Sequence, residues 1–298
     1  MAVSVQIQAV IYKNDKESLK RAFLSLANAI RVNRNNGKEL GEVTVAYGDA
    51  SPEPIYTQDE VAALTEEFLE YFNFRYTFFN ENTGYGKGQN LLSQSATADY
   101  LFIINPDILV CPTIFSGMLS PFSDHSVGIV EARQTPLEHP KEYDRVTLET
   151  PWVTGACFMI PTKLFQKISG FDHDSFFLYC EDVDLSWRVR LLGKKLIYRP
   201  DCVGFHAKRL TATANWQPTA SEAYYSQESA LFMAYKWSNN DRFKKLYHRF
   251  ANGDEVGKRI VAKFDAMKKA GTLPKQLDPN HKIAKFYGDD FAKSRYTY

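Results

Sequence analysis

The sequence predicts an α/β fold, in which a mostly parallel, Rossmann-like central sheet carries helices on both faces and a helical extension follows. In residues 3–104, short apolar runs alternate with amphipathic stretches of helical periodicity. This alternation is typical of βαβ units. From residue 222 onward the pattern is helical. We therefore expect an α/β domain at residues 1–220 and a helical extension at residues 221–298.

The expected strands are apolar runs that are bounded by turn residues: residues 3–12, 43–47, 75–79, 100–104, 152–160, 196–198 and 202–205. Helices are expected at residues 16–33 and 58–73, and a third should follow a loop at residues 82–90 and end near residue 96. Residues 133–150 are polar, contain two prolines and are expected to form a loop over the site. In parallel sheets, ligands bind beyond the carboxyl ends of the strands.

Charge is distributed unevenly along the chain. The formal net charge is +1, which gives no signal for nucleic-acid binding. Residues 221–298, however, contain 15 Lys and Arg against 9 Asp and Glu. A basic extension predicts an anionic surface as its neighbour, and a solvated helical face is the alternative.

The four cysteines, Cys111, Cys157, Cys180 and Cys202, lie in apolar segments without a CxxC pair. We expect free thiols in a reducing compartment, and the spacing argues against a zinc site. The first residues lack the basic and apolar regions of a signal peptide, and no apolar run approaches the length of about 18 residues that a membrane span needs. These features predict a cytoplasmic location without a membrane-spanning helix.

Three carboxylates follow an aromatic, apolar run at residues 176–178: Glu181, Asp182 and Asp184. A helical pattern continues from them to Gly193, so part of the cluster could simply cap a helix, where the dipole favours acids. Acids beside buried aromatic residues are also typical of pockets that need a base or a metal ligand. We expect this cluster to form the floor of a pocket.

Asn105 and Asp107 directly follow an apolar strand, and His206 ends another. A divalent cation that is bound to a diphosphate needs one or two such protein ligands, since phosphate oxygens and water complete its shell. Asp107 and His206 could supply them from different strands. The alternatives are a helix cap for Asp107 and a packed or surface position for His206.

Gly84, Gly86 and Gly88 have the spacing GxGxG, which is not the dinucleotide fingerprint. Their loop could approach an anionic ligand closely, with Lys87 facing phosphate. A tight turn at a helix entry is the alternative. Asp49 follows the second strand and could bind a base or a ribose hydroxyl; an Asx-type turn before Pro52 is the alternative.

In their order along the chain, these signals resemble inverting family 2 glycosyltransferases of the GT-A fold, over roughly residues 3–210. The matching pieces are residues 82–86 with Asn90, residues 104–107, residues 153–157, residues 170–172, and residues 181–185 with Arg188. The Glu-Asp-Val-Asp-Leu run behind Gly-Phe-Asp is the specific part of this resemblance, and the glycine loop is not specific.

The resemblance implies a role for each matching residue. Asp107 would be the metal ligand, with Asn105 in the place of the first acid, and His206 would contact the metal or the diphosphate. Asp182 would be the general base, and Glu181 would orient it or bind the acceptor. The residues that would bind the nucleotide sugar are Asp49, Asn82, Gly84, Lys87, Asn90, Asn105, Gly155 and Arg188. Gly48 stands where the family often has an acid, and the metal motif supplies one carboxylate rather than two.

The resemblance also implies substrates and partners. Within the family, the sequence most resembles bacterial rhamnosyltransferases that build cell-surface polysaccharides such as O-antigen and cell-wall glycans. The donor would be dTDP-L-rhamnose with Mg²⁺ or Mn²⁺, and the acceptor a glycan or a lipid-diphosphate-linked glycan. The alternatives are a galactofuranosyl- or other hexosyltransferase that uses a UDP-sugar, and a non-catalytic nucleotide-sugar-binding scaffold. A nucleotidyltransferase would need a glycine-rich basic signature after the first strand, which residues 12–15 lack. The extension could contact the inner membrane face, form a homodimer or pack on the catalytic domain.

Overall fold

The computed structural model describes residues 2–37, 40–206 and 219–296. Eight strands lie in this part of the chain: β1 (Val3–Ile11), β2 (Leu40–Asp49), β3 (Asn73–Phe78), β4 (Tyr100–Ile104), β5 (Ile108–Val110), β6 (Val127–Thr135), β7 (Cys157–Pro161) and β8 (Lys195–His206). They form one sheet in the order β3-β2-β1-β4-β7-β6-β8-β5. The predicted α/β class is confirmed.

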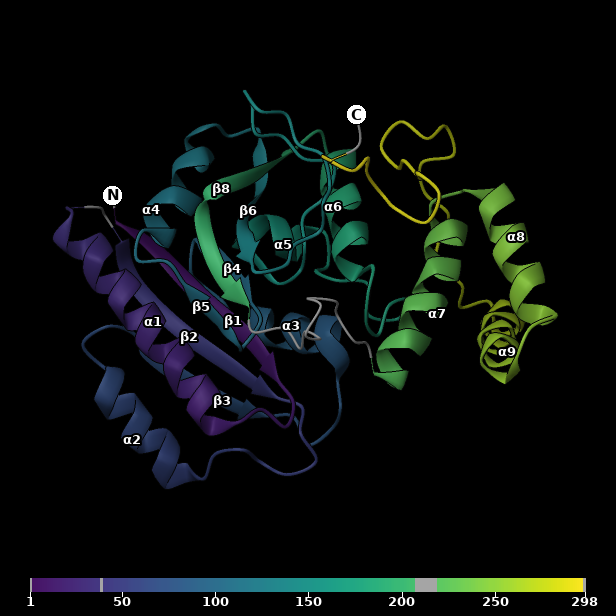
Figure 1. The fold of residues 1–298 in the computed structure, drawn as a ribbon. Helices are drawn as coiled ribbons and strands as arrows, with labels where there is room; N and C mark the ends of the chain where they lie inside the picture. The colour runs from purple at the N-terminus through teal and green to yellow at the C-terminus, as the bar shows by residue number, and fades with distance from the viewer. Residues whose placement is uncertain (1, 38–39, 207–218, 297–298) are drawn as a thin grey trace.

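Helices cover both faces of this sheet (Figure 1). The helices of the described residues are α1 (Lys16–Asn35), α2 (Gln58–Phe68), α3 (Gly84–Gln94), α4 (Ile114–Leu119), α5 (Thr162–Lys167), α6 (Glu181–Leu191), α7 (Ala220–Lys236), α8 (Asn240–Ala251) and α9 (Glu255–Ala270). One face of the sheet contacts α1, α2 and α4, and the other contacts α3, α5 and α6. In the described chain, no helix combines the length and the apolar composition that crossing a bilayer requires.

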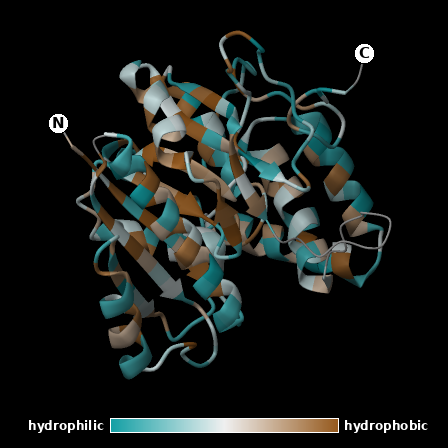
Figure 2. Ribbon diagram, turned by 60° about the vertical axis from the view of Figure 1, so that its left-hand side comes forward, coloured by the Kyte–Doolittle hydropathy of each residue, from teal (hydrophilic) through white to brown (hydrophobic). Residues whose placement is uncertain are grey.

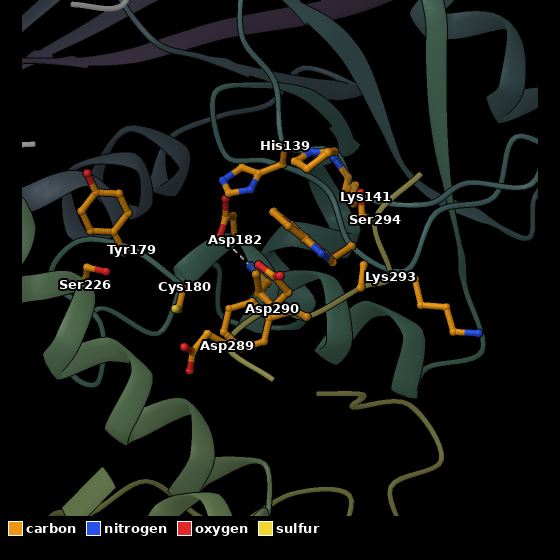
Figure 3. A pocket seen from close by; sticks show the side chains of 15 residues that line it. His139, Lys141, Tyr179, Cys180, Asp182, Ser226, Asp289, Asp290, Lys293 and Ser294 are labelled. Carbon is orange, nitrogen blue, oxygen red and sulfur yellow. Dashed lines mark hydrogen bonds between the residues drawn. The ribbon is translucent and has the colours of Figure 1, made fainter. Parts of the chain in front are cut away.

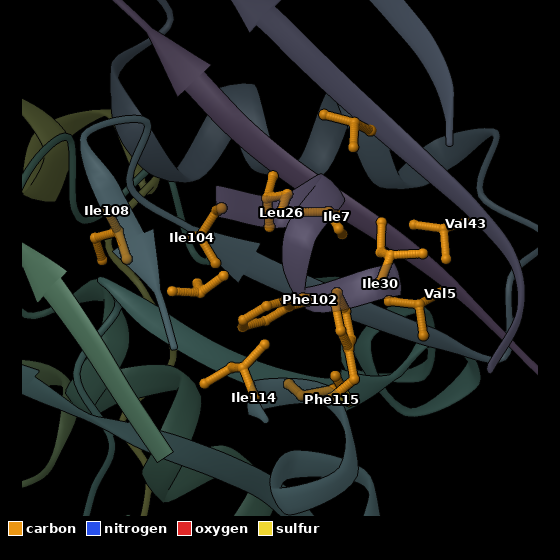
Figure 4. Packing of buried hydrophobic residues seen from close by; sticks show 14 of the residues in the cluster. Val5, Ile7, Leu26, Ile30, Val43, Phe102, Ile104, Ile108, Ile114 and Phe115 are labelled. Atoms are coloured by element: carbon orange, nitrogen blue, oxygen red, sulfur yellow. The ribbon is translucent and has the colours of Figure 1, made fainter. Parts of the chain in front are cut away.

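The strand period of two sorts side chains between the two faces. Ile7, Phe102 and Ile104 pack with Leu26 and Ile30 of α1 in one hydrophobic cluster (Figure 4). Their sequence neighbours point to the opposite face, where Leu101 and Ile103 join a second cluster with residues of α5 and α6. The sheet is therefore buried on both sides, and the strands appear as apolar bands between more polar helices in Figure 2.

The sheet is mixed, with parallel and antiparallel pairs. β1, β2, β3 and β4 pair in parallel, as expected. β7 lies between β4 and β6 and runs antiparallel to both. β4, β6 and β8 consequently point in the same direction, since β6 and β8 pair in parallel. Their carboxyl ends meet at one edge of the sheet.

Several predicted element boundaries were wrong. The glycines of residues 82–90 lie inside α3, which begins at Gly84, rather than in a loop before it. Residues 133–135 belong to β6, and residues 152–156 precede β7 rather than forming part of it. The two short strands expected near residue 200 are a single strand, β8, whose pairing with β6 is irregular after Ala132. Periodicity did not reveal β5, α4 or α5, because each spans six residues or fewer.

The helices of the C-terminal extension pack against the α/β domain. Trp152, Phe176 and Trp187 share one hydrophobic cluster with Leu231 and Phe232 of α7. The same cluster continues into α8 and α9. Packing on the α/β domain, one of the arrangements expected for the extension, is therefore present; the boundary between residues 220 and 221 stays a prediction.

A buried carboxylate also joins the two parts. Asp184 of α6 is fully buried and accepts hydrogen bonds from Arg188 Nε at 2.7 Å and Trp237 Nε1 at 3.0 Å. Lys236 Nζ lies 2.6 Å from the same carboxylate and 2.6 Å from Asp172. Lys236 and Trp237 stand at the end of α7, so the last turn of that helix is fixed to α6 through charge as well as through apolar contacts.

We predict that Asp184→Asn lowers the free energy of unfolding by about 3–5 kcal/mol, because it removes the carboxylate that Arg188 and Lys236 share and leaves Asp172 as the remaining anion beside Lys236. Urea denaturation monitored by tryptophan fluorescence measures this change. Lys258→Ala, which breaks an exposed pair with Glu255 on α9, is the control and should cost less than about 0.5 kcal/mol. Equal stability of the two variants would contradict a structural role for Asp184.

Candidate active site

A cavity of about 450 Å³ lies where the carboxyl ends of β4, β6 and β8 meet. The turn after β4 contributes Asn105 and Asp107, and β8 contributes His206. Gly155 and the first residues of α6, Glu181 and Asp182, form the opposite side, and Tyr85, Thr154 and Gln134 also line it. The structure thus brings six of the predicted site residues to one cavity: Asn105, Asp107, Gly155, Glu181, Asp182 and His206.

Strand pairing places Asp107 beside His206. Ile108 at the start of β5 is the register partner of His206 at the end of β8, so the preceding residue lies next to the imidazole. Asp107 Oδ1 is 3.3 Å from His206 Nε2, and Asn105 Nδ2 is 3.4 Å from the same nitrogen. His206 Nδ1 is buried without a hydrogen-bond partner.

Asp107 and His206 fit a divalent cation that is shared with a ligand. Within residues 2–37, 40–206 and 219–296, no group of three or more His, Cys, Asp and Glu side chains could hold a metal ion by itself. One carboxylate and one imidazole suit a cation whose other ligands are phosphate oxygens and water. Asp107 and His206 are the residues that would hold it.

The backbone around Asp182 holds its carboxylate in the cavity. Tyr179 and Cys180 adopt left-handed conformations, with φ of 69° and 64°, and this turn starts α6. Asp182 Oδ2 accepts from Gly155 N at 2.8 Å, and Oδ1 accepts from Val183 N at 2.8 Å. Tyr85 donates its hydroxyl proton to the Gly155 carbonyl. The Gly155 residue is therefore held from both sides.

Two adjacent acids in this low-dielectric site have raised pKa values. Burial raises the pKa of Glu181, and the negative charge of Asp182 raises it further. Burial also raises the pKa of Asp182, against the lowering effect of the Gly155 and Val183 amides. Glu181 Oε2 has no hydrogen-bond partner. A carboxylate whose pKa is raised toward neutrality is a better proton acceptor than an exposed one.

Two predicted donor-binding residues, Asp49 and Arg188, have their side chains directed into the protein. Asp49 is fully buried and accepts from Ser51 N at 2.9 Å and Ile55 N at 2.8 Å, which is the turn that the sequence left as the alternative. The Arg188 guanidinium pairs with Asp184 and donates to the carbonyls of residues 168 and 170. Internal partners thus hold both side chains, and the donor contacts of Asp49 and Arg188 stay predictions.

The four predicted donor-binding residues of the 82–90 segment do not line this cavity, although Tyr85 of the same segment does. Asn82 Oδ1 accepts from Gly84 N at 3.2 Å, and Lys87 pairs with Glu81 at 2.7 Å. Asn90 bonds both the backbone N–H and the carbonyl of Phe171 at 2.8 Å. Gly84 has a φ of +65°, and a Cβ there would lie 2.8 Å from Phe177. These contacts support α3 and the Gly-Phe-Asp turn, and the ligand roles of Asn82, Gly84, Lys87 and Asn90 stay predictions.

Sequence reasoning missed residues that support the site from behind. Tyr85 stood inside the expected glycine loop without an assigned role. Glu131 and Lys141 form a buried ion pair at 2.7 Å next to Thr154. Glu131 was the one residue that the sequence could have singled out, because it interrupts the apolar run of β6. Lys141 lies in a polar segment, where a lysine is expected on the surface and gives no sign of burial.

A family model, "Glycosyl transferase family 2", matches residues 9–185. This match covers more than half of the chain and includes the whole Glu-Asp-Val-Asp-Leu run. The chain belongs to glycosyl transferase family 2.

Curated relatives of this family 2 chain include rhamnosyltransferases. The chain is 29% identical to rhamnosyltransferase WbbL of Escherichia coli over 107 residues; this match covers 36% of this chain and 34% of the relative. It is 27% identical to the N-acetylglucosaminyl-diphospho-decaprenol L-rhamnosyltransferase of Mycobacterium tuberculosis over 135 residues; this match covers 44% of this chain and 41% of the relative. The chain thus matches less than half of the length of these relatives.

Solved structures of other glycosyltransferases share the GT-A fold with this chain. GalNAc-T7 with UDP, GalNAc and Mn²⁺ matches with a TM-score of 0.64 at 13% identity, covering 95% of this chain and 57% of that chain. The mannosyltransferase PcManGT of Pyrobaculum calidifontis, in complex with GDP-Man and Mn²⁺, matches with a TM-score of 0.53 at 15% identity, covering 91% and 84%. At such low identity, the likeness shows the fold alone.

The raised pKa of Glu181 predicts a pH-dependent stability difference for Glu181→Gln. Because the folded-state pKa lies above the unfolded value, Glu181 stabilises the fold while it is protonated, and this contribution is lost as pH rises through the folded-state pKa. The variant, which stays uncharged, should match the wild type near pH 4 and melt roughly 2 °C or more above it near pH 9.

Thermal melting of both proteins across this pH range tests the prediction. Glu66→Gln, the same change at an exposed position on α2, is the control and should show no such divergence. A Glu181→Gln protein that gains nothing at alkaline pH would show that the carboxyl is readily ionised in the folded state.

Proposed function

We propose that the protein is an inverting glycosyltransferase that moves L-rhamnose from dTDP-L-rhamnose to a hydroxyl of a growing bacterial surface polysaccharide or lipid-linked glycan. The observation that carries this proposal is one cavity that holds both a candidate base, Asp182, and the candidate cation ligands Asp107 and His206. Family membership supports the reaction class, and the names of the relatives support the rhamnosyl group.

The chemistry follows from where charge develops. Departure of the nucleoside diphosphate creates negative charge, which a bound divalent cation would stabilise as a Lewis acid. Asp107 and His206 would hold that cation on the diphosphate side of the cavity. The oxygen of the acceptor hydroxyl forms the new bond to the anomeric carbon, and Asp182 accepts the proton of that hydroxyl. The reaction needs no covalent sugar intermediate, so the anomeric configuration inverts.

The donor is tested with a panel of nucleotide sugars in Mg²⁺, Mn²⁺ or EDTA. We expect metal-dependent hydrolysis or binding that is selective for dTDP-L-rhamnose. Selective turnover of a UDP-sugar would keep the mechanism and replace rhamnose by galactofuranose or another hexose. Binding without turnover, even with acceptor glycans present, would favour a non-catalytic scaffold, and absence of nucleotide binding would refute the proposal.

Asp182→Asn should lower the rate of transfer or donor hydrolysis by about 10²–10⁴ while nucleotide affinity stays unchanged, because an amide cannot accept the proton. Steady-state kinetics and calorimetric nucleotide titration measure the two quantities. Asp174→Asn, whose side chain is exposed in the same segment, is the control and should keep the wild-type rate. A fully active Asp182→Asn protein would remove Asp182 from the role of base.

We also propose that α8 lies against an anionic membrane surface, where lipid-linked acceptors are found. Lys244, Lys245 and Arg249 are exposed on one side of this helix, whose opposite side buries Leu246 and Phe250. Each basic residue near an anionic bilayer contributes about 1 kcal/mol of attraction. A homodimer contact through the same helix is the competing arrangement.

Reversing these three charges to Glu should weaken binding to phosphatidylglycerol vesicles by roughly 10²-fold or more. Vesicle sedimentation measures the affinity. The control carries the same number of reversals at exposed positions of the α/β domain, Arg31, Lys163 and Lys167, and should bind as the wild type does. Equal binding by both variants would remove the membrane proposal, and sedimentation velocity would detect a dimer.

A further inference from the structure

A buried ion pair lies directly behind the candidate base. Lys141 Nζ is 2.7 Å from Glu131 Oε1, and the two side chains are only 4% and 2% exposed. Buried pairs of this kind are often no more stabilising than apolar residues of the same volume. Stability alone therefore does not account for this pair, and its position relative to Asp182 becomes informative.

Hydrogen bonds connect the pair to Asp182 through two consecutive residues. Glu131 Oε1 also accepts from Thr154 N at 3.0 Å and from Thr154 Oγ1 at 2.8 Å. The next residue, Gly155, donates its N–H to Asp182 Oδ2 at 2.8 Å. Lys141 and Asp182 also line one cavity of about 210 Å³ (Figure 3). Asp182 lines both this cavity and the cavity that holds Asp107 and His206.

The segment that carries Lys141 is held by residues 293–295 of the extension. Lys141 and Ser294 form an antiparallel bridge, and Glu142 N donates to Lys293 O at 2.8 Å. Arg295 N donates to Pro140 O at 2.6 Å, and Arg295 Nε donates to Lys141 O at 2.9 Å. Figure 3 shows Lys141 beside Ser294 at the wall of the cavity. Lys141 itself belongs to no helix or strand, so these contacts fix its place.

We infer that Lys141 is a positioning residue for Asp182, and that residues 293–295 keep it in that place. Its ammonium group fixes Glu131, Glu131 fixes Thr154, and the Gly155 amide then meets the carboxylate that accepts the proton. This inference rests on the proposed function of Asp182 as base. It also gives the extension a part in the reaction that does not involve a membrane.

Charge provides a second link between Lys141 and Asp182. Burial raises the pKa of Asp182, the Gly155 and Val183 amides lower it, Lys141 lowers it further, and Glu131 raises it. Other titratable or charged groups lie around this carboxylate on its own helix and on the facing segments: Glu181, Asp184, Tyr85, Asp107, His139, Tyr179, Cys180, His206, Glu222, Asp289, Asp290 and Lys293. Removing Lys141 leaves Glu131 unpaired among them, so Asp182 should hold its proton to higher pH.

The test is the pH dependence of donor hydrolysis by Lys141→Met. We expect the acid limb of kcat/KM to move up by about one pH unit, with a lower kcat, and Lys141→Arg to restore the wild-type profile. Lys263→Met breaks another ion pair with a buried carboxylate, Glu228, in the extension. This control should lose stability without any shift of the acid limb. An unshifted acid limb in Lys141→Met would reduce Lys141 to a structural residue.

Hydrogen exchange supplies a readout that does not depend on turnover. Loss of Lys141 should accelerate exchange at the Thr154 and Gly155 amides, while the Lys263→Met control leaves them protected. If the wild type neither hydrolyses nor transfers any nucleotide sugar, even with acceptor glycans present, the proposed function fails, and these amides still decide the inference. If Lys141→Met does not fold, Arg295→Ala takes its place, with the same direction of change expected. Unchanged exchange in the substituted protein would overturn the inference.

Discussion

The buried carboxylate of Asp184 ties helix α6 to the extension, and α6 is also the helix that delivers Asp182 to the cavity. Residues two positions apart in an α-helix point in directions that differ by about 200°, so Asp182 and Asp184 face opposite sides of α6. Asp184 meets Lys236 and Trp237 of α7, and Asp182 meets the Gly155 amide. A single rigid helix thus couples the packing of the two parts to the geometry of the site.

The same arrangement explains why adjacent acids behave differently. Asp184 is surrounded by cations and an indole N–H, which satisfy its charge. Glu181 has no such partner on Oε2 and has a raised pKa. Asp182 lies between these extremes, because it accepts two backbone amides in a low-dielectric setting. The Glu-Asp-Val-Asp run therefore contains three different electrostatic environments within one helical turn.

Much of the fold could be predicted because its first half is built from local signals. Strand and helix periods alternate up to residue 104, an acid at a strand end pointed to Asp107, and the acidic cluster after an apolar aromatic run pointed to Asp182. The antiparallel entry of β7 between β4 and β6 has no local signature, since strand direction depends on contacts far away in sequence. The internal partners of Asp49, Asn90 and Arg188 could not be predicted for a related reason: a polar side chain beside a motif looks the same whether its partner is a ligand or a distant backbone group. Lys141 was missed because residues more than 150 positions away put it in place.

The contact between residues 140–142 and 293–295 also bears on the order of folding. It joins residues about 150 positions apart in the sequence. Closing such a long loop costs conformational entropy, and the contacts that offset this cost form only after the intervening elements have folded. The sheet and its helices can therefore condense before the segment beneath Asp182 is pinned.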